Sequence, residues 1–317
     1  MANQYTGTST IINQTGIAGL IKTSYDRYIE FALRSQPLLR GLADRRPVQQ
    51  AFPGTSVVFQ NYVDLSAATS TLTENVDPDS VALTDLTNTT VTLAEYGNVV
   101  LETRKLAELS LSDVDPAIAN IVAYNMADSL DQVVQTVLRG GSNIIYASTA
   151  TSTATVTNTM TITGANLRKA TSKLKAGNAL PRFGTLYACY MHPEVSHDLK
   201  AESGSGAFED IRKYTDANVG NILNGVAGVV HGSFVVESPR MYNATDGSTS
   251  TRVFRTLVAG QQALAEAVAI EPGIVIGPIT DKLMRARPVG WYGLLGWSLY
   301  RTASLWQIQS TSSIDNA

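Results

Sequence analysis

The sequence contains little of what marks the commonest specialised protein classes. Its 317 residues include one cysteine, Cys189, so no disulfide can form within the chain. Charged residues make up 16% of the chain, against about 25% in ordinary soluble domains. The net charge of -3 argues against a dedicated nucleic-acid binder, because such proteins cluster Lys and Arg to neutralise phosphates. Any contact with a polyanion must therefore be local.

Long apolar runs and export signals are also missing. A membrane span needs about 18 to 20 consecutive apolar residues. Residues 217–236 carry no charge, but three Asn, one His and four Gly interrupt them. The first twenty residues contain no Lys or Arg and no apolar core, so they do not form a signal peptide. We therefore expect synthesis in the cytoplasm and no membrane association.

Motifs that carry catalysis at fixed spacing are absent. The chain has no phosphate-binding loop, no dinucleotide-binding glycine pattern, no nucleophile elbow and no zinc-binding pattern. His192 and His197 are five residues apart, which places them off one helix face, so we expect no metal and no cofactor. Cys189 and His192 alternate to opposite sides of a predicted strand, which favours a buried core thiol. A hydrolase site around His192, Asp198 and a nearby Ser remains an alternative.

The first half of the chain predicts an arm, a β excursion and a long helix. Residues 1–22 are polar and have no period, so they indicate an extended arm, and a short helix follows from Ser24. Residues 55–65 and 89–103 alternate apolar and polar side chains, as strands do. The connection at 66–88 is longer than a hairpin loop, and such loops are usually functional. Asp115 and Pro116 then open a helix that runs to Arg139 with one apolar stripe.

The second half predicts alternating strands and short helices. Threonine occupies every odd position from 149 to 163, a strand period that predicts a strand or hairpin with a threonine face, although a solvated linker remains possible. Helices are expected at 165–176, from Pro193 and at 261–267. Strands are expected at 185–192, 225–236, 253–259 and 273–279. Five aromatic residues between Trp291 and Trp306 are expected to be core or interface anchors.

Charge is separated along the chain. Between Asp64 and Asp115 there are ten carboxylates against two cations, and no Lys or Arg lies between Arg46 and Arg104. Between Lys22 and Arg46 there are six cations against three carboxylates. Opposite patches on one chain favour contacts between copies. The candidate contact residues are Glu74, Asp77, Asp79, Asp85, Arg27, Arg34, Arg40, Arg45 and Arg46.

This order of elements resembles the major capsid protein of tailed double-stranded DNA bacteriophages, an α+β protein of the Hong Kong 97-like (HK97-like) fold, and in particular the phage N4-like capsid group. The resemblance lies in GTSVVFQNYVDL, in TLTENVDPDSVALTDLTNTTVTLAEYGNVVLETRKL, in the helix from Asp115 to Arg139 and in VGWYGLLGWSLYRTASLWQIQ. It implies five parts: an N-terminal arm at 1–45, an E-loop at 46–104, a P-domain at 105–177 with a spine helix at 116–139, an A-domain at 178–275, and C-terminal P-domain strands at 276–317.

The resemblance also implies a function and partners. It implies a virion protein that is not an enzyme and whose copies form the hexamers and pentamers of an icosahedral shell around DNA. Separate scaffold, portal and decoration proteins are expected, with packaged DNA on the inner face. The namesake of the family crosslinks its shell through an E-loop lysine, but residues 47–103 here contain none, so we expect non-covalent contacts. An encapsulin-type compartment or another phage assembly subunit is the alternative.

Overall fold

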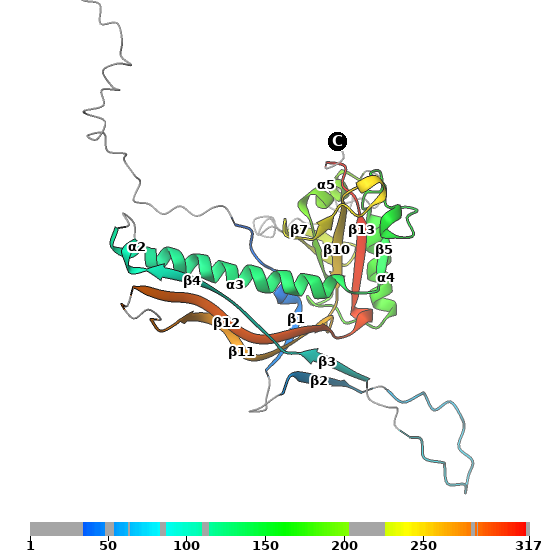
Figure 1. Cartoon of the computed structure of the whole chain (residues 1–317). Helices are drawn as coiled ribbons and strands as arrows, with labels where there is room; N and C mark the ends of the chain where they lie inside the picture. The colour runs from blue at the N-terminus through cyan, green and yellow to red at the C-terminus, as the bar shows by residue number, and fades with distance from the viewer. Residues whose placement is uncertain are drawn as a thin grey trace, which may run out of the picture.

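A computed structural model describes residues 34–314 apart from 48–53, 63, 83–86, 110–113, 203–225, 280–282 and 284. The described strands form a four-stranded sheet, a seven-stranded sheet and a two-stranded hairpin (Figure 1). The predicted helix from Ser24 lies outside the described residues. No helix in the described part is long and apolar enough to span a membrane.

The long helix α3 (Val114–Arg139) lies along one face of the four-stranded sheet (Figure 1). It begins at the predicted Asp115-Pro116 pair and ends at Arg139, before two glycines. Its buried stripe includes Val122, Leu130, Val134 and Leu138. The sheet order is β1 (Ala43–Pro47), β11 (Leu264–Ile276), β12 (Ala286–Leu299) and β4 (Ala94–Thr103), with β1 parallel to β11 and the other pairs antiparallel.

The seven-stranded sheet forms a second unit at the C-terminal end of α3 (Figure 1). Helices α4 (Gly164–Ala176) and α5 (Pro193–Ala201) accompany it, close to where the sequence predicts helices. Its strands in order are β5 (Ile144–Tyr146), β13 (Leu305–Ser310), β10 (Val253–Ala259), β6 (Tyr187–Met191), β8 (Ser233–Glu237) and β7 (Val226–Val230), and β9 (Asn243–Ala244) pairs with β10. Short 3-10 helices lie at Leu39–Leu42, directly before β1, and at Thr153–Thr155, Ser248–Ser250 and Thr302–Ser304.

A buried ion pair joins the two units and the segment that enters them. Asp131 of α3 is 2% exposed and accepts hydrogen bonds from the Leu39 backbone N–H (2.7 Å) and from Arg240 Nε (3.2 Å). Arg240 also pairs with Asp128 and donates to Ser35 Oγ (3.4 Å). Burial by itself would lower the pKa of Arg240, but its hydrogen bonds to the Asp128 and Asp131 carboxylates and their negative charges raise it overall, so the guanidinium stays charged. We call Asp128, Asp131 and Arg240 the spine clamp.

The threonine run is not a strand. Residues 149–163 form turns and the 3-10 helix at Thr153–Thr155, with an isolated bridge from Thr161 to Thr311. The hydroxyl of Thr155 accepts from the backbone N–H groups of Thr151 and Ser152 and donates to the Ser152 carbonyl (2.8 Å). Such local bonds compete with a β ladder, so the period of two was misleading.

The prediction of a helix at 261–267 is wrong, as is that of the threonine strand. Gln262 has a positive φ of 58°, and Leu264 begins the long strand β11. The alanine-rich segment favours a helix by intrinsic propensity, but it pairs with β1 on one side and β12 on the other. Strand pairing has therefore overridden the local preference.

The sheets group the chain differently from the predicted domain ranges. Strands β5 and β13 fall in the ranges predicted for the P-domain, but they lie in the seven-stranded sheet. Strand β11 falls in the predicted A-domain range, but it lies in the four-stranded sheet. The chain therefore passes from one sheet to the other more than once, because each sheet pairs strands that are distant in sequence.

Breaking the spine clamp should destabilise the whole subunit. We expect Arg240→Met to lower the free energy of unfolding by about 3–5 kcal/mol, because it leaves the buried Asp131 carboxylate without its charged partner. Thermal and denaturant unfolding of the unassembled subunit measures this. Thr136→Ala is the control, because Thr136 is exposed on the same helix and its hydroxyl bonds the Gln132 carbonyl (3.0 Å), away from the clamp. Equal stability of Arg240→Met and the wild type would contradict a structural role for the clamp.

Candidate assembly surface

The loop between strands β2 (Ser56–Asn61) and β3 (Thr87–Thr92) extends away from both sheets (Figure 1). Glu74, Asp77 and Asp79 are exposed on it, whereas Asp85 lies outside the described residues. A turn at Thr73–Val76 is closed by a backbone hydrogen bond of 3.3 Å. Large apolar side chains are exposed beside the carboxylates, namely Tyr62, Leu65, Leu72, Val76 and Val81. The loop therefore presents apolar and acidic groups together, a combination typical of a surface that meets a partner.

The base of this loop is fixed to the four-stranded sheet. Phe59 is buried and packs on Tyr300, with ring centroids 5.9 Å apart, and Val91 is completely buried. Arg301 donates to the side chain of Asn61 (2.8 Å). At Gly296 of β12, an added Cβ would lie well inside van der Waals contact with the Thr92 carbonyl. The hairpin can cross β12 this closely because position 296 has no side chain.

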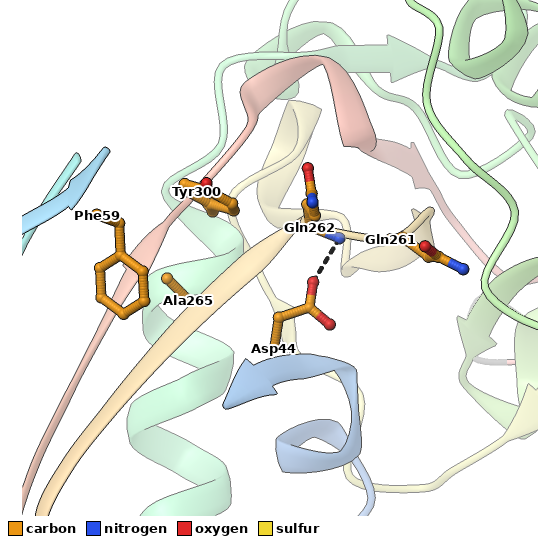
Figure 2. A pocket seen from close by; sticks show the side chains of 6 residues that line it. All are labelled: Asp44, Phe59, Gln261, Gln262, Ala265 and Tyr300. Atoms are coloured by element: carbon orange, nitrogen blue, oxygen red, sulfur yellow. Dashed lines mark hydrogen bonds between the residues drawn. The ribbon is translucent and has the colours of Figure 1, made fainter. Parts of the chain in front are cut away.

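A small cavity of about 160 Å³ lies beside this base (Figure 2). Asp44 closes it by accepting a hydrogen bond from the Gln262 backbone N–H (2.6 Å), and Phe59 and Tyr300 lie at its other side. Asp44 also accepts from Arg182 (3.1 Å). The carboxylate therefore ties β1 to the turn before β11, and the cavity shows no cluster of catalytic groups.

The predicted basic partners of the loop are already engaged within the chain. Arg40 donates to the buried Glu266 (2.8 Å), and Arg45 pairs with Glu271. Arg34 lies over the ring of Tyr124, 4.8 Å from its centroid. Arg27 lies outside the described residues, and the side chain of Arg46 is not described. The structure thus uses Arg34, Arg40 and Arg45 to hold the segment 34–47 on its own body, through partners far away in sequence.

In the described part of the chain, a different surface is exposed on the side of the four-stranded sheet opposite α3, beyond the end of this side that the hairpin β2–β3 crosses at Gly296. Trp291 faces α3, where it donates to Asn125 (2.9 Å), so its neighbours along β12 point the other way. The strand register places Val99 opposite Gly290 and Leu101 opposite Pro288. The groove on this face, of about 470 Å³, is lined by Gly97, Asn98, Val99, Val275, Gly277, Pro288, Gly290 and Trp291.

Apolar side chains remain exposed on this face, and cations lie at its end. Val99 is 64% exposed and Leu101 is 58% exposed. Arg104 and Lys105 follow directly after β4 and are exposed. We use the name outer sheet face for the exposed side chains of this face together with Arg104 and Lys105, which lie at the end of β4, where helix α2 (Arg104–Leu109) begins. The sequence does not reveal this face, because alternation predicts a strand but does not show which of its faces another element covers.

The residues of the hydrolase alternative have structural partners. His192 caps α5 by accepting from the Glu194 N–H (3.3 Å) and packs on Phe254. Asp198 accepts from the backbone N–H of Ser313 (2.9 Å) and from its hydroxyl, which holds the segment after β13 on α5. A nucleophilic serine needs a hydrogen bond to the imidazole. Here the hydroxyl of Ser313 bonds Asp198, and that of Ser196 bonds Glu237. Among the described residues no cluster of three or more His, Cys, Asp or Glu could hold a metal ion.

Comparisons with known proteins give a consistent picture. A sequence model described as phage capsid protein matches residues 11–301. Among curated proteins, no sequence matches. The capsid of Ralstonia phage GP4 superposes with a TM-score of 0.74 at 14% identity and covers 92% of this chain and 95% of its own. The capsid of Helicobacter pylori bacteriophage KHP30 gives 0.72 at 16% identity, covering 98% and 100%. At such identities these likenesses show the fold.

Gly296 should be needed for the loop to sit correctly. We expect Gly296→Ala to destabilise the subunit by about 1–3 kcal/mol, because the new methyl group displaces the Thr92 carbonyl. Hydrogen exchange should also become faster at the amides of β2 and β3, which locates the effect. Gly41→Ala is the control, since an added Cβ there meets nothing within 4 Å. Unchanged exchange in the hairpin would show that the crossing tolerates a side chain.

Cys189 should be inert in the folded subunit. Burial raises the pKa of its thiol to about 12, so the nucleophilic thiolate is scarce until strongly alkaline pH. We expect no alkylation by iodoacetamide at pH 9 in the native protein and rapid alkylation after unfolding, both followed by mass spectrometry. Stability should also fall as the pH rises from about 9 towards 12, because the unfolded chain ionises this thiol first. Fast labelling of the native protein would contradict the buried assignment.

Proposed function

Because this chain belongs to the phage capsid protein family, we propose that its copies assemble by non-covalent contacts into an icosahedral shell around the double-stranded DNA of a tailed bacteriophage. The family match confirms the resemblance to phage capsid proteins, and the fold is the HK97-like capsid fold that this resemblance implied. The structural, shell-forming role follows from the family. What remains a proposal is how the copies meet and what else they bind.

We assign the parts of the fold by their architecture. The hairpin β2–β3 with its loop is the E-loop, α3 is the spine helix, and the four-stranded sheet with α3 is the P-domain. The seven-stranded sheet with α4 and α5 is the A-domain, so this domain takes β13 from the end of the described chain. The N-terminal arm would reach a neighbouring copy through residues that precede the described segment.

The contact between copies is proposed to join the E-loop to the outer sheet face of a neighbour. The observation that carries this is complementarity: the loop exposes Leu72, Val76 and Val81 beside carboxylates, and the sheet face exposes Val99 and Leu101 beside cations. Burying apolar area supplies the stabilisation, at about 25 cal/mol per Å². The opposite charges determine how the loop and the sheet face align with each other more than they add to affinity. The earlier basic candidates Arg34, Arg40 and Arg45 would instead keep each subunit in shape.

The proposal includes other proteins that the shell would meet and the place where the subunit is made. The shell would carry a portal, would be built on a separate scaffold and would accept decoration proteins. Synthesis in the host cytoplasm would precede assembly into the virion. An encapsulin-type compartment shares the architecture and would differ in its contents, so nucleic acid inside purified particles separates the two. We propose no catalytic activity, which is supported by the capping and anchoring roles of His192 and Asp198.

Reversing the charge of the E-loop should block assembly. We expect a variant with Glu74, Asp77, Asp79 and Asp85 all changed to Lys to form particles in much lower yield, because like charges then meet at Arg104 and Lys105. Negative-stain electron microscopy and sedimentation measure the yield. The side chains of Glu74, Asp77 and Asp79 are exposed, so the melting temperature of the unassembled subunit should not change.

A charge swap supplies the matched control. Changing Arg104 and Lys105 to Glu should also lower the yield, and combining both sets of changes should restore part of it. Normal particles from the loop variant would overturn the electrostatic part of the contact. Loss in both variants without restoration in the combination would show that the loop and these two cations do not meet.

A further inference from the structure

Helix α4 carries a concentration of positive charge that the proposed contact between copies does not use. One side of it is buried on the seven-stranded sheet, where Leu167 and Leu174 are completely buried in a cluster with Val258 and Ile308. The segment from Gly164 to Ala176 contains no carboxylate. Its four cations are Arg168, Lys169, Lys173 and Lys175, and all four are exposed.

The cations are arranged in two rows. At about 100° per residue, Arg168 and Lys175 lie along one edge of the exposed side, and Lys169 and Lys173 lie along the other. A rise of about 1.5 Å per residue separates the members of each row by about 10 Å and about 6 Å along the axis. Between the rows lie only small side chains, Ala165, Ser172 and Ala176. We call this side of the helix the α4 cationic face.

Nothing in the described part of the chain neutralises this face. Arg40, Arg182 and Arg240 each form an ion pair with a carboxylate, but no ion pair involves the four cations of α4 within the described residues. The nearby Glu202 is engaged, because it accepts the Gly164 backbone N–H (2.7 Å).

The helix itself accounts for only half of this charge. Lys173 and Lys175 lie in the last turn, where the helix dipole favours cations. Arg168 and Lys169 lie outside that turn, so the dipole gives no reason for them.

We propose that the α4 cationic face binds the phosphate backbone of double-stranded DNA without sequence preference. Duplex DNA carries one negative charge per about 1.7 Å of its axis, so two rows of cations can contact several phosphates at once. Small residues between the rows let the backbone approach closely. The face has no aromatic side chain on which an unstacked base could lie, which favours the duplex over single strands. This inference rests on the proposed function, since a shell around DNA supplies the ligand, and it turns α4 towards the shell interior.

The acidic E-loop of a second copy is the competing ligand, and the structure favours DNA over it. The loop exposes Leu72, Val76 and Val81 with its carboxylates. A partner for the loop must therefore cover apolar area as well as charge. The α4 cationic face offers only Ala165, Ser172 and Ala176 for this, whereas the outer sheet face offers large apolar side chains.

The test measures binding of a fluorescein-labelled 30-base-pair duplex to the full-length unassembled subunit at several salt concentrations. We expect the variant Arg168→Gln, Lys169→Gln, Lys173→Gln, Lys175→Gln to bind about tenfold or more weakly at low salt. The slope of log affinity against log salt should fall by about 0.9 for each phosphate contact removed. Two duplexes of unrelated sequence should behave alike. The charge-conserving variant Lys169→Arg, Lys173→Arg, Lys175→Arg should bind as the wild type does.

Other outcomes would overturn the inference. Equal affinity and salt slope in the neutralised variant and the wild type would remove α4 as the binding surface. If a synthetic peptide of residues 64–82 binds in an α4-dependent way while the duplex does not, the face is a contact between copies. The Arg168→Gln, Lys169→Gln double variant keeps the cations of the last turn, so a loss of DNA binding there cannot come from a damaged helix end.

Measuring shell assembly beside duplex binding shows whether the proposed function or the DNA-binding surface fails. Shells of the neutralised variant that assemble normally but retain less duplex support both proposals. If the wild-type chain forms no shells but binds the duplex through α4, the proposed function fails and the binding surface stands.

Discussion

The spine clamp is the interaction on which the arrangement of the subunit depends. Asp131 is a carboxylate with almost no access to water, and such a group is tolerated only when it is paired and hydrogen-bonded. Its two oxygens accept from the segment entering the fold and from the turn before β9, so three parts of the chain meet at one buried charge. Arg240 extends this contact to Ser35 and Tyr124. The angle between the long helix and the second sheet is therefore set by directional bonds in addition to apolar packing.

Local signals in the sequence predicted the elements whose ends are marked chemically. The Asp115-Pro116 pair and the Arg139-Gly140 pair delimit α3 in the structure almost as they do in the sequence. Pro193 opens α5, and every residue of the strand before it is buried, as its apolar composition suggests. Where hydroxyl groups compete for the backbone, as at Thr155, the same kind of pattern was misleading. Local periodicity also could not foresee that Leu264 would be captured by two strands distant in sequence.

Of the two sides of the proposed contact, only the acidic loop could be predicted from the sequence. An unbroken run without Lys or Arg marks the acidic loop, and its Glu74, Asp77 and Asp79 are exposed as expected. The cations proposed to meet this loop could not be found in this way, because a cation in a sequence does not reveal its partner. Arg40 and Arg45 are bound by Glu266 and Glu271, more than two hundred positions later. Only the fold shows which cations are already neutralised and which remain available.

The position of β13 means that the seven-stranded sheet cannot form fully until the end of the described chain has been made. This strand lies between β5 and β10, although it is the last strand in the described sequence. Until residues 305–310 are synthesised, β5 has no strand to pair with, and one edge of β10 remains open to other chains. Asp198 then holds the segment after the strand on α5. A nascent subunit on the ribosome thus lacks the finished seven-stranded sheet until this last described strand has been made.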